Sequence, residues 1–516
     1  MTNREQVVQI LTELQNQGVR HLVVCPGGRN APFVDFLSYG KHPFQIHTHF
    51  DERAASFFAL GLSQNFKQPV AVLTTSGTAV SETLSACIEA HHTQTPLAIL
   101  SADRPKSYRG SGAPQTIDQA ELLSSHCSLK FDLEKAPLEL LPWDLKSPIH
   151  INVCFDEPLV DTQPPHEWSK SSENLTAKKK SESWEDKQTS ALKSFLKDLK
   201  KPLLVLSGQT HFSKDTLIQN LKSLNLPVFL ESTSQLKNHP ELKDLEIHFP
   251  SLAIQAGHFD SILRIGQVPL HRFWRDLEFQ PLPTLHISSS AYPGLSEQRL
   301  ILPENEKFFE ELQQFSLHSD KALKDKDFQQ KEKLQKALKD HPHSEAAWMF
   351  QLQHHWPKEE LVYLGNSLPI RQWDLANVAS EISFSNVAAS RGANGIDGQL
   401  STFYGRSYER SKSLALLGDL TTLYDLSGPW AAPHQGCHHV AVFNNQGGFI
   451  FDRMFGKDLF LNRHSLQFEK WADFWNLPYQ KWTSPSEVQF EDFQKGHLIE
   501  ILPDAKDSKD FWESLR

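Results

Sequence analysis

The 516-residue sequence has no long apolar run, and no stretch approaches the roughly 20 consecutive apolar residues of a membrane-spanning helix. Its first six residues, Met1-Thr2-Asn3-Arg4-Glu5-Gln6, are polar and include an acidic side chain, so they do not resemble a signal peptide. Only five cysteines occur, without paired spacing, which argues against a disulfide framework and a zinc site. We therefore expect a cytoplasmic protein without a membrane span.

The sequence also lacks an excess of positive charge. Its 52 lysines and arginines are outnumbered by 62 acidic residues, and the formal net charge is −10. This balance argues against a nucleic-acid-binding protein, and the run Lys178-Lys179-Lys180 is more typical of a solvated face. The middle of the chain has no G-x-G-x-x-G motif, so the sequence gives no support for dinucleotide binding there.

The length of the chain exceeds what a single hydrophobic core normally holds, and roughly three domains are expected. Short apolar runs alternate with helical patterns, which predicts an α/β fold with doubly wound parallel sheets. We place three such domains at residues 1–165, 201–320 and 345–516. A polar linker that includes a solvated helix, residues 166–200, and a charged, helix-prone connector, residues 321–344, are predicted to join them.

Two strand ends in the last domain have the chemistry of a cofactor site. The apolar run Leu414–Leu417 ends in Gly418-Asp419, and Val440–Phe443 ends in Asn444-Asn445-Gln446-Gly447-Gly448, with room for one crossover helix between them. Open α/β sheets bind ligands at the carboxyl ends of their strands. Asp419 and Asn445 offer hard oxygens for a divalent cation on a phosphate, and the glycines allow close backbone approach. Two ordinary strand-to-loop corners are the alternative for this stretch alone.

The first domain offers a glutamate at a helix start and a loop suited to an anion. Glu52 opens a helix rich in small residues, and Ser76-Gly77-Thr78-Ala79 follows the predicted strand Val70–Thr74. A glutamate in this position is also favoured by the helix dipole alone. Together with a diphosphate site, however, Glu52 suggests a thiamine diphosphate enzyme, where a glutamate hydrogen-bonds the aminopyrimidine ring and promotes deprotonation of the thiazolium carbon.

The motifs resemble those of the thiamine diphosphate enzymes and, among them, the 2-succinyl-5-enolpyruvyl-6-hydroxy-3-cyclohexene-1-carboxylate synthases of menaquinone synthesis. The resemblance covers the first and third domains closely and the middle one loosely. The stretches that carry it are Cys25-Pro26-Gly27-Gly28-Arg29-Asn30-Ala31-Pro32, Asp51-Glu52-Arg53-Ala54-Ala55, Thr75-Ser76-Gly77-Thr78-Ala79, Ala102-Asp103-Arg104-Pro105, Gly365-Asn366-Ser367, Arg391 to Gly398, Leu400-Ser401-Thr402, Gly418-Asp419-Leu420 and Tyr424-Asp425-Leu426.

The resemblance implies roles for the cofactor residues. It makes Glu52 the activating glutamate and Ile396 the apolar wedge that bends thiamine diphosphate, and it assigns Asp419, Asn445 and the Gly447 carbonyl to a Mg²⁺ or Mn²⁺ ion on the diphosphate. The other cofactor contacts that it implies are Ser76, Gly77, Gly418 and Leu420. It also implies a homodimer or homotetramer with active sites between subunits.

The implied reaction is decarboxylation of 2-oxoglutarate followed by addition to isochorismate. Both substrates carry two carboxylates, which favours several fixed arginines. The matching arginines are Arg29, Arg104, Arg272, Arg371 and Arg391, and Gln115 and Ser367 are their neutral partners. The resemblance makes Glu52, Arg29 and Arg391 the catalytic residues. Two alternatives stay open: another thiamine-diphosphate 2-oxo-acid decarboxylase or ligase, and a catalytically silent homologue with a binding role.

The sequence departs from the family pattern in three places. Gly28 replaces the serine usual in the first motif, and His271 stands where lysine is common, so substrate affinity could gain a pH dependence. The crossover between the two strand ends contains Pro429, Pro433 and Gly436 in place of a regular helix.

Overall fold

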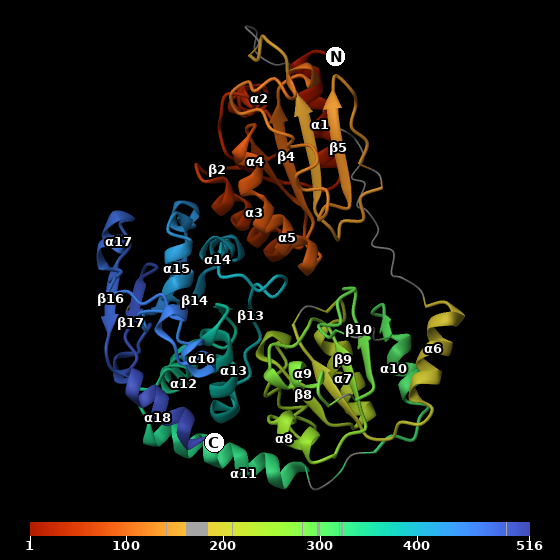
Figure 1. Cartoon of the computed structure of the whole chain (residues 1–516), viewed down its shortest axis with the longest axis vertical. Helices are drawn as coiled ribbons and strands as arrows, with labels where there is room; N and C mark the ends of the chain where they lie inside the picture. The colour runs from red at the N-terminus through yellow and green to blue at the C-terminus, as the bar shows by residue number, and fades with distance from the viewer. Residues whose placement is uncertain are drawn as a thin grey trace. The chain divides into compact units, whose positions relative to one another are not determined.

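The computed structural model describes residues 1–140, 142–160, 184–208, 210–280, 282–296, 300–318, 320, 323–491 and 493–515. Residues 166–183 of the predicted linker 166–200 lie outside the described residues. The described chain contains three parallel-sheet α/β domains (Figure 1), which confirms the predicted fold class. Its contacts group it into two compact units: a first unit of Met1–Lys179, Gly392–Ser411 and Leu420–His438, and a second unit of Lys180–Arg391, Lys412–Asp419 and His439–Arg516.

The first sheet has six strands, and each neighbouring pair is parallel. In spatial order they are β2 (Gln45–Thr48), β1 (His21–Val24), β3 (Val70–Thr74), β4 (Leu97–Asp103), β6 (Ile149–Cys154) and β5 (Leu129–Glu134). The helices of this domain are α1 (Asn3–Asn16), which precedes β1, and α2 (Ala31–Ser38), α3 (Glu52–Phe66), α4 (Thr78–Glu82) and α5 (Leu84–Thr93), which follow it. Every residue of β1, β3 and β4 is buried, as expected for central strands covered on both faces.

The second sheet has five strands, again in parallel pairs. Their order is β11 (Leu300–Leu302), β10 (Thr284–Ile287), β9 (Ser261–Ile265), β7 (Pro202–Leu206) and β8 (Val228–Leu230). Its helices are α6 (Asp186–Leu196), α7 (Lys214–Leu224), α8 (Pro250–Gln255), α9 (Arg272–Asp276) and α10 (Lys307–Leu312). Helix α6 falls inside the interval predicted as a polar linker, yet Trp184, Leu192 and Leu196 are buried in the core of this sheet.

The third sheet carries the two predicted strand ends. Its order is β13 (Val387–Ala388), β12 (Leu361–Leu364), β14 (Lys412–Gly418), β15 (Cys437–Phe443), β17 (Leu498–Ile501) and β16 (Tyr479–Trp482). The helices in this part of the sequence are α12 (Glu345–His355), α13 (Leu368–Ser380), α14 (Gln399–Ser407), α15 (Asp419–Tyr424), α16 (Asp452–Phe455), α17 (Glu469–Phe474) and α18 (Ala505–Ser514). Of these, α14 and the residues of α15 after Asp419 group with the first unit. The crossover from β14 to β15 consists of helix α15 followed by a 3-10 turn at Gly428–Ala431. The crossover helix predicted there is therefore present, but it is only 6 residues long.

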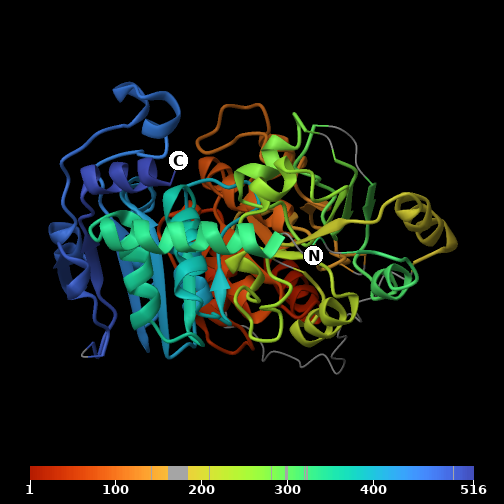
Figure 2. The ribbon, with the colours of Figure 1, turned by 90° about the horizontal axis from the view of Figure 1, so that it is seen from below.

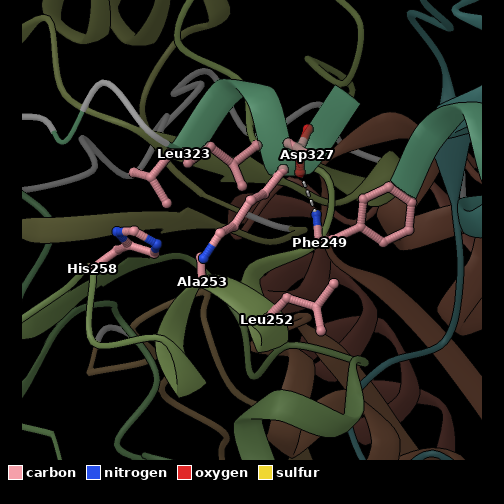
Figure 3. A pocket seen from close by; sticks show the side chains of 8 residues that line it. Phe249, Leu252, Ala253, His258, Leu323 and Asp327 are labelled. Atoms are coloured by element: carbon pink, nitrogen blue, oxygen red, sulfur yellow. Dashed lines mark hydrogen bonds between the residues drawn. The ribbon is translucent and has the colours of Figure 1, made fainter. Parts of the chain in front are cut away.

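The charged connector forms one long helix, α11 (Leu323–Asp340), which lies beside the helices of the third sheet (Figure 2). Leu334 and Leu338 pack with Val378 of α13 and Phe511 of α18. At its other end, Asp327 accepts hydrogen bonds at 2.9 Å from the backbone amides of His248 and Phe249. A narrow pocket lies at this junction (Figure 3). The connector is thus packed within the second unit along its described length.

Helices α3 and α14 cross at two glycines in the first unit. A Cβ atom added to Gly61 would lie 2.2 Å from the Thr402 carbonyl oxygen, and one on Gly405 would lie 2.2 Å from the Phe58 carbonyl oxygen. Any larger side chain at either position therefore forces the two backbones apart. This contact attaches the segment after the Arg391–Gly398 motif to the helix that begins with Glu52.

None of the helices in the described ranges has the length and apolarity needed to cross a membrane.

The stability of the fold is expected to fall in mild acid because it buries neutral histidines. His150 is fully buried, its Nε2 lies 2.8 Å from the Ser101 hydroxyl, and burial lowers its pKa to about 4 from 6.5. A histidine with a depressed pKa contributes its full stability above pH 6.5 and loses it as the pH falls toward 4. We expect roughly 2 kcal/mol of unfolding free energy to disappear through His150 between about pH 7.5 and 4.5.

The measurement is urea unfolding of the wild type and His150→Gln across this pH range. Glutamine can keep the contact with Ser101 but does not titrate. The pH dependence of the unfolding free energy should therefore be shallower in the variant, and equal slopes would contradict the prediction.

Candidate active site

The loop after β1 is closed by one buried side chain. Asn30 is fully buried, its Oδ1 accepts from the Gly27 amide at 2.9 Å, and its Nδ2 donates to the Cys25 carbonyl at 2.9 Å. The backbone amide of Arg29 in turn donates to the Thr75 hydroxyl at 3.2 Å. These bonds fix the loop that carries Arg29 against the end of β3.

Arg29 and Arg104 lie close enough at the carboxyl ends of β1 and β4 to repel each other. Burial, together with the charge of Arg104, lowers the pKa of Arg29. The Arg104 amide donates to Asp103 Oδ1 at 2.8 Å, and Asp103 is itself buried. Two partly desolvated cations on neighbouring loops form a place where a carboxylate can be bound with charge-assisted hydrogen bonds.

The Ser76-Gly77 loop at the end of β3 offers a buried hydroxyl. Ser76 is fully buried, and its Oγ has no hydrogen-bond partner in the part of the chain that the structure describes. Gly77 has φ +82°, and its amide donates to Gln119 Oε1 at 2.9 Å, while the backbone of Gln115 packs against it. Buried hydroxyls normally have partners, so a bound polar group would complete this loop. Gln119 belongs to no motif, and sequence reasoning missed it.

Glu52 is the first residue of α3, and Asp51 caps that helix. Asp51 Oδ1 accepts from the amides of Arg53 and Ala54 at 3.0 and 3.1 Å. Burial raises the pKa of Glu52, and the nearby carboxylates of Asp51 and Glu82 raise it further. A carboxyl group with a raised pKa is suited to sharing a proton with a weakly basic ring nitrogen.

The two strand ends of the third sheet are joined by a direct hydrogen bond. Asp419 is 2% exposed, and its Oδ2 accepts from the Gly447 amide at 2.9 Å. Gly447 has φ +146°, and a Cβ atom there would lie 2.5 Å from the Leu461 carbonyl oxygen, so only glycine fits. Gly418 and Leu420 flank Asp419 at the turn into α15.

Asn445 presents a buried oxygen at the same place. Its Nδ2 donates to Glu345 Oε1 at 2.6 Å, and its Oδ1 is buried and has no hydrogen-bond partner among the described residues. Asp419, Asn445 Oδ1 and the Gly447 carbonyl are hard oxygens, so these residues fit a small divalent cation. Within the described ranges no three His, Cys, Asp or Glu side chains gather as a metal cage, so such a cation would take its other ligands from phosphate or water.

Two more of the predicted arginines follow strands of the third sheet: Arg371 in the first turn of α13, after β12, and Arg391 in the loop after β13. Arg371 donates to the Ser367 carbonyl at 2.5 Å, and Ser367 has φ +76° at the start of α13. Arg391 donates to Asn366 Oδ1 at 3.0 Å. A positive φ at a serine is a strained conformation of the kind found at functional sites.

A buried carboxyl group, Glu231, lies near both arginines. Glu231 is 2% exposed and follows β8, and its Oε1 accepts from the Leu270 amide at 2.6 Å. Burial raises the pKa of Glu231, and the charges of His271 and Arg391 oppose this increase. Burial lowers the pKa of Arg371, and the charge of Glu231 opposes that decrease. No motif contains Glu231, and its place at the carboxyl end of a buried strand was the only signal in the sequence.

Arg272 does not join this group, although its neighbour His271 does. The Arg272 side chain is 74% exposed and pairs with Asp276 at 2.7 Å, one helical turn away. His271 Nε2 instead lies 2.7 Å from Oδ2 of the buried Asp374, which Lys237 Nζ also contacts at 2.7 Å. The structure thus places His271, and not Arg272, in the buried charge network.

The loop that carries Ile396 is held by a residue that sequence reasoning missed. Ile396 is half-buried, and the preceding amides of Gly392 and Ala393 donate to the two carboxylate oxygens of Glu89 at 2.8 and 2.7 Å. Glu89 is 4% exposed on α5. This bidentate contact fixes the start of the loop against the first sheet's helices.

The substitution Gly28→Ser is expected to be tolerated and to leave substrate affinity unchanged or improved. A Cβ atom at Gly28 would meet no atom within 4 Å, and the residue has no positive φ. The added hydroxyl lies next to Arg29, where it can donate to a bound carboxylate. The measurement is the apparent KM for each substrate, and a large loss of affinity would show that the loop depends on glycine.

Comparison with known proteins identifies relatives along nearly the whole chain. Residues 1–122 match the family described as thiamine pyrophosphate enzyme, N-terminal TPP binding domain. The chain is 38% identical to the 2-succinyl-5-enolpyruvyl-6-hydroxy-3-cyclohexene-1-carboxylate synthase of Bdellovibrio bacteriovorus, over 99% of this chain and 98% of that relative. It is 33% identical to the synthase of the same name from Akkermansia muciniphila, over 98% and 97%.

A solved structure shows the same fold. Benzoylformate decarboxylase from Polynucleobacter necessarius superposes with a TM-score of 0.71 at 16% identity, covering 98% of this chain and 99% of that one. The sequence matches and this fold lead to one conclusion. The chain belongs to the family of 2-succinyl-5-enolpyruvyl-6-hydroxy-3-cyclohexene-1-carboxylate synthases, which are thiamine diphosphate enzymes.

Proposed function

We propose that the protein decarboxylates 2-oxoglutarate and adds the resulting unit to isochorismate, in menaquinone biosynthesis. The products are 2-succinyl-5-enolpyruvyl-6-hydroxy-3-cyclohexene-1-carboxylate and CO₂. The observation that carries the proposal is the match to the Bdellovibrio synthase along 99% of the chain. The intact set of Glu52, Asp419 and Asn445 supports an active enzyme over a catalytically silent homologue.

The two ends of the cofactor are proposed to be held by residues of two subunits, the pyrimidine ring by one subunit and the diphosphate by the other. When bound, thiamine diphosphate supplies the carbon nucleophile and accepts the electron pair left by CO₂. Glu52 holds a proton at the pyrimidine ring, and Ser76, Gly77 and Ile396 line its surroundings. Asp419, Asn445 and the Gly447 carbonyl hold Mg²⁺ or Mn²⁺ on the diphosphate, with Gly418 and Leu420 beside them.

The substrate carboxylates are proposed to bind to the partly buried arginines. Arg29 and Arg104 supply one cationic pair, and Arg371 and Arg391 supply another near Glu231. Gln115 and Ser367 are proposed as neutral partners. Since both substrates are dianions, two separate cationic pairs match their charge, which favours this reaction over one with a small neutral acceptor. Arg272 would have to leave Asp276 to contribute.

We further propose a homodimer or homotetramer with active sites between subunits. The support is the resemblance to thiamine diphosphate enzymes, in which two subunits complete each site. A cytoplasmic location likewise stays a prediction, supported by five cysteines that are all free in the structure.

Assay of the purified protein with thiamine diphosphate and Mg²⁺ tests the proposed reaction. We expect CO₂ release from 2-oxoglutarate and, with isochorismate present, an adduct of the expected mass. Turnover of pyruvate but not of 2-oxoglutarate would favour a different decarboxylase or ligase. Absence of both turnover and cofactor binding would favour a silent homologue.

A further inference from the structure

Glu345 is a buried carboxylate next to the proposed cation site. It is the first residue of α12, is 5% exposed, and forms no ion pair with any of the described residues. Both carboxylate oxygens instead accept from side-chain amides: Oε1 from Asn445 Nδ2 at 2.6 Å, and Oε2 from Gln372 Nε2. Burying a carboxylate is costly. Proximity to a helix N-terminus stabilises it but does not account for two aligned amide partners.

The contact with Glu345 fixes which way the Asn445 amide faces. A carboxylate can only accept hydrogen bonds, so the Asn445 NH₂ group has to face Glu345. The Asn445 oxygen then points to the opposite side, where it is buried and no described residue bonds to it. Gln372 is 2% exposed on α13, and its bond to Oε2 holds the carboxylate itself in place. The result is an amide oxygen of fixed orientation two residues before Gly447, whose backbone amide contacts Asp419.

We propose that Glu345 is a positioning residue that locks the Asn445 amide with its oxygen toward the divalent cation. This inference rests on the proposed cation site at Asp419, Asn445 and Gly447. Without an acceptor at position 345, the amide can rotate and present its NH₂ group, which cannot ligate a metal ion. Residues that orient a metal ligand commonly change metal affinity by about 10- to 100-fold when they are replaced.

Two substitutions separate orientation from charge. In Glu345→Gln, the new amide oxygen still accepts from Asn445, and Gln372 can turn its own amide to accept from the new NH₂ group. In Glu345→Met, no acceptor remains. If Glu345 acts by orienting Asn445, Gln preserves cation binding and Met does not; if only its negative charge mattered, both variants would weaken binding alike.

The experiment measures Mn²⁺ binding by the electron paramagnetic resonance signal of the free ion, with thiamine diphosphate present. We expect Glu345→Met to bind Mn²⁺ at least about 10-fold more weakly and Glu345→Gln to stay within about threefold of the wild type. Gln353→Met is the matched control because Gln353 is also buried on α12 but bonds the Trp373 carbonyl and the Ser380 hydroxyl rather than Asn445. It should bind like the wild type.

The decisive comparison uses Asn445→Ala. Since Glu345 is proposed to act through Asn445, adding Glu345→Met to Asn445→Ala should weaken Mn²⁺ binding no further. Additive losses, equal losses in the Met and Gln variants, or wild-type binding by Glu345→Met would each overturn the inference. If circular dichroism shows that Glu345→Met does not fold, Glu345→Ala carries the same expectations. A wild type that binds no Mn²⁺ would instead contradict the proposed cation site.

Discussion

Replacing Glu52 by glutamine is expected to lower kcat by about 100- to 10,000-fold while thiamine diphosphate affinity stays within about threefold. Glutamine matches glutamate in size but cannot give or take a proton. Burial and two neighbouring carboxylates raise the pKa of Glu52, which makes its protonated form accessible for exchange with the cofactor ring. The measurements are the initial rate of CO₂ release and calorimetric titration with thiamine diphosphate.

Glu82→Gln is the control for this prediction. Glu82 is exposed and acts on Glu52 only through its charge, so its replacement should change kcat by less than about threefold. Full activity in Glu52→Gln would mean that another group activates the cofactor. Loss of cofactor binding in that variant would instead assign Glu52 a purely structural role.

Asp374→Asn is expected to destabilise the second unit by about 3–5 kcal/mol, because it leaves a buried lysine without its counter-ion. Asp374 is fully buried on α13; its Oδ2 contacts Lys237 Nζ and His271 Nε2, and its Oδ1 accepts from the amide and hydroxyl of Ser232. Burial raises the pKa of Asp374, but Lys237 and His271 outweigh this and hold it well below its usual range.

Urea unfolding at neutral pH measures the effect of Asp374→Asn. Glu241→Gln is a matched control, since Glu241 pairs with Lys222 at 2.6 Å but both side chains are about half exposed, and surface pairs contribute little. The control should leave the unfolding midpoint unchanged. A midpoint for Asp374→Asn equal to that of the wild type would show that the network around Asp374 does not stabilise the fold.

The sequence predicted the parallel sheets and the strand ends at Asp419 and Asn445 because both depend on local pattern. A short buried strand followed by glycine and polar residues can be recognised from a short window of the sequence. The residues that support these corners could not be found in this way. Glu345 lies 100 residues before Asn445, and Glu231 lies 39 residues before Leu270, so only tertiary packing brings each pair together.

Side-chain pairing and helix packing were harder to predict from the sequence than the sheets. The substrate-binding role of Arg272 stays a prediction; in the structure its exposed side chain pairs with Asp276 on the same helix. Helix α6 looked like solvated linker because its polar residues outnumber its apolar ones, yet two leucines are enough to anchor it in the second sheet's core. Residue types alone do not show which side chains will form an ion pair within a helix or which will be buried by tertiary contacts.

The central claim is that the strand ends at Asp419 and Asn445 hold the cofactor's diphosphate through a divalent cation. Calorimetric titration of thiamine diphosphate, with Mg²⁺ and with a chelator, tests it most directly in the wild type and Asp419→Ala. We predict that Mg²⁺ tightens binding by at least about 10-fold in the wild type and has no effect in the variant. The same Mg²⁺ enhancement in Asp419→Ala would contradict the claim.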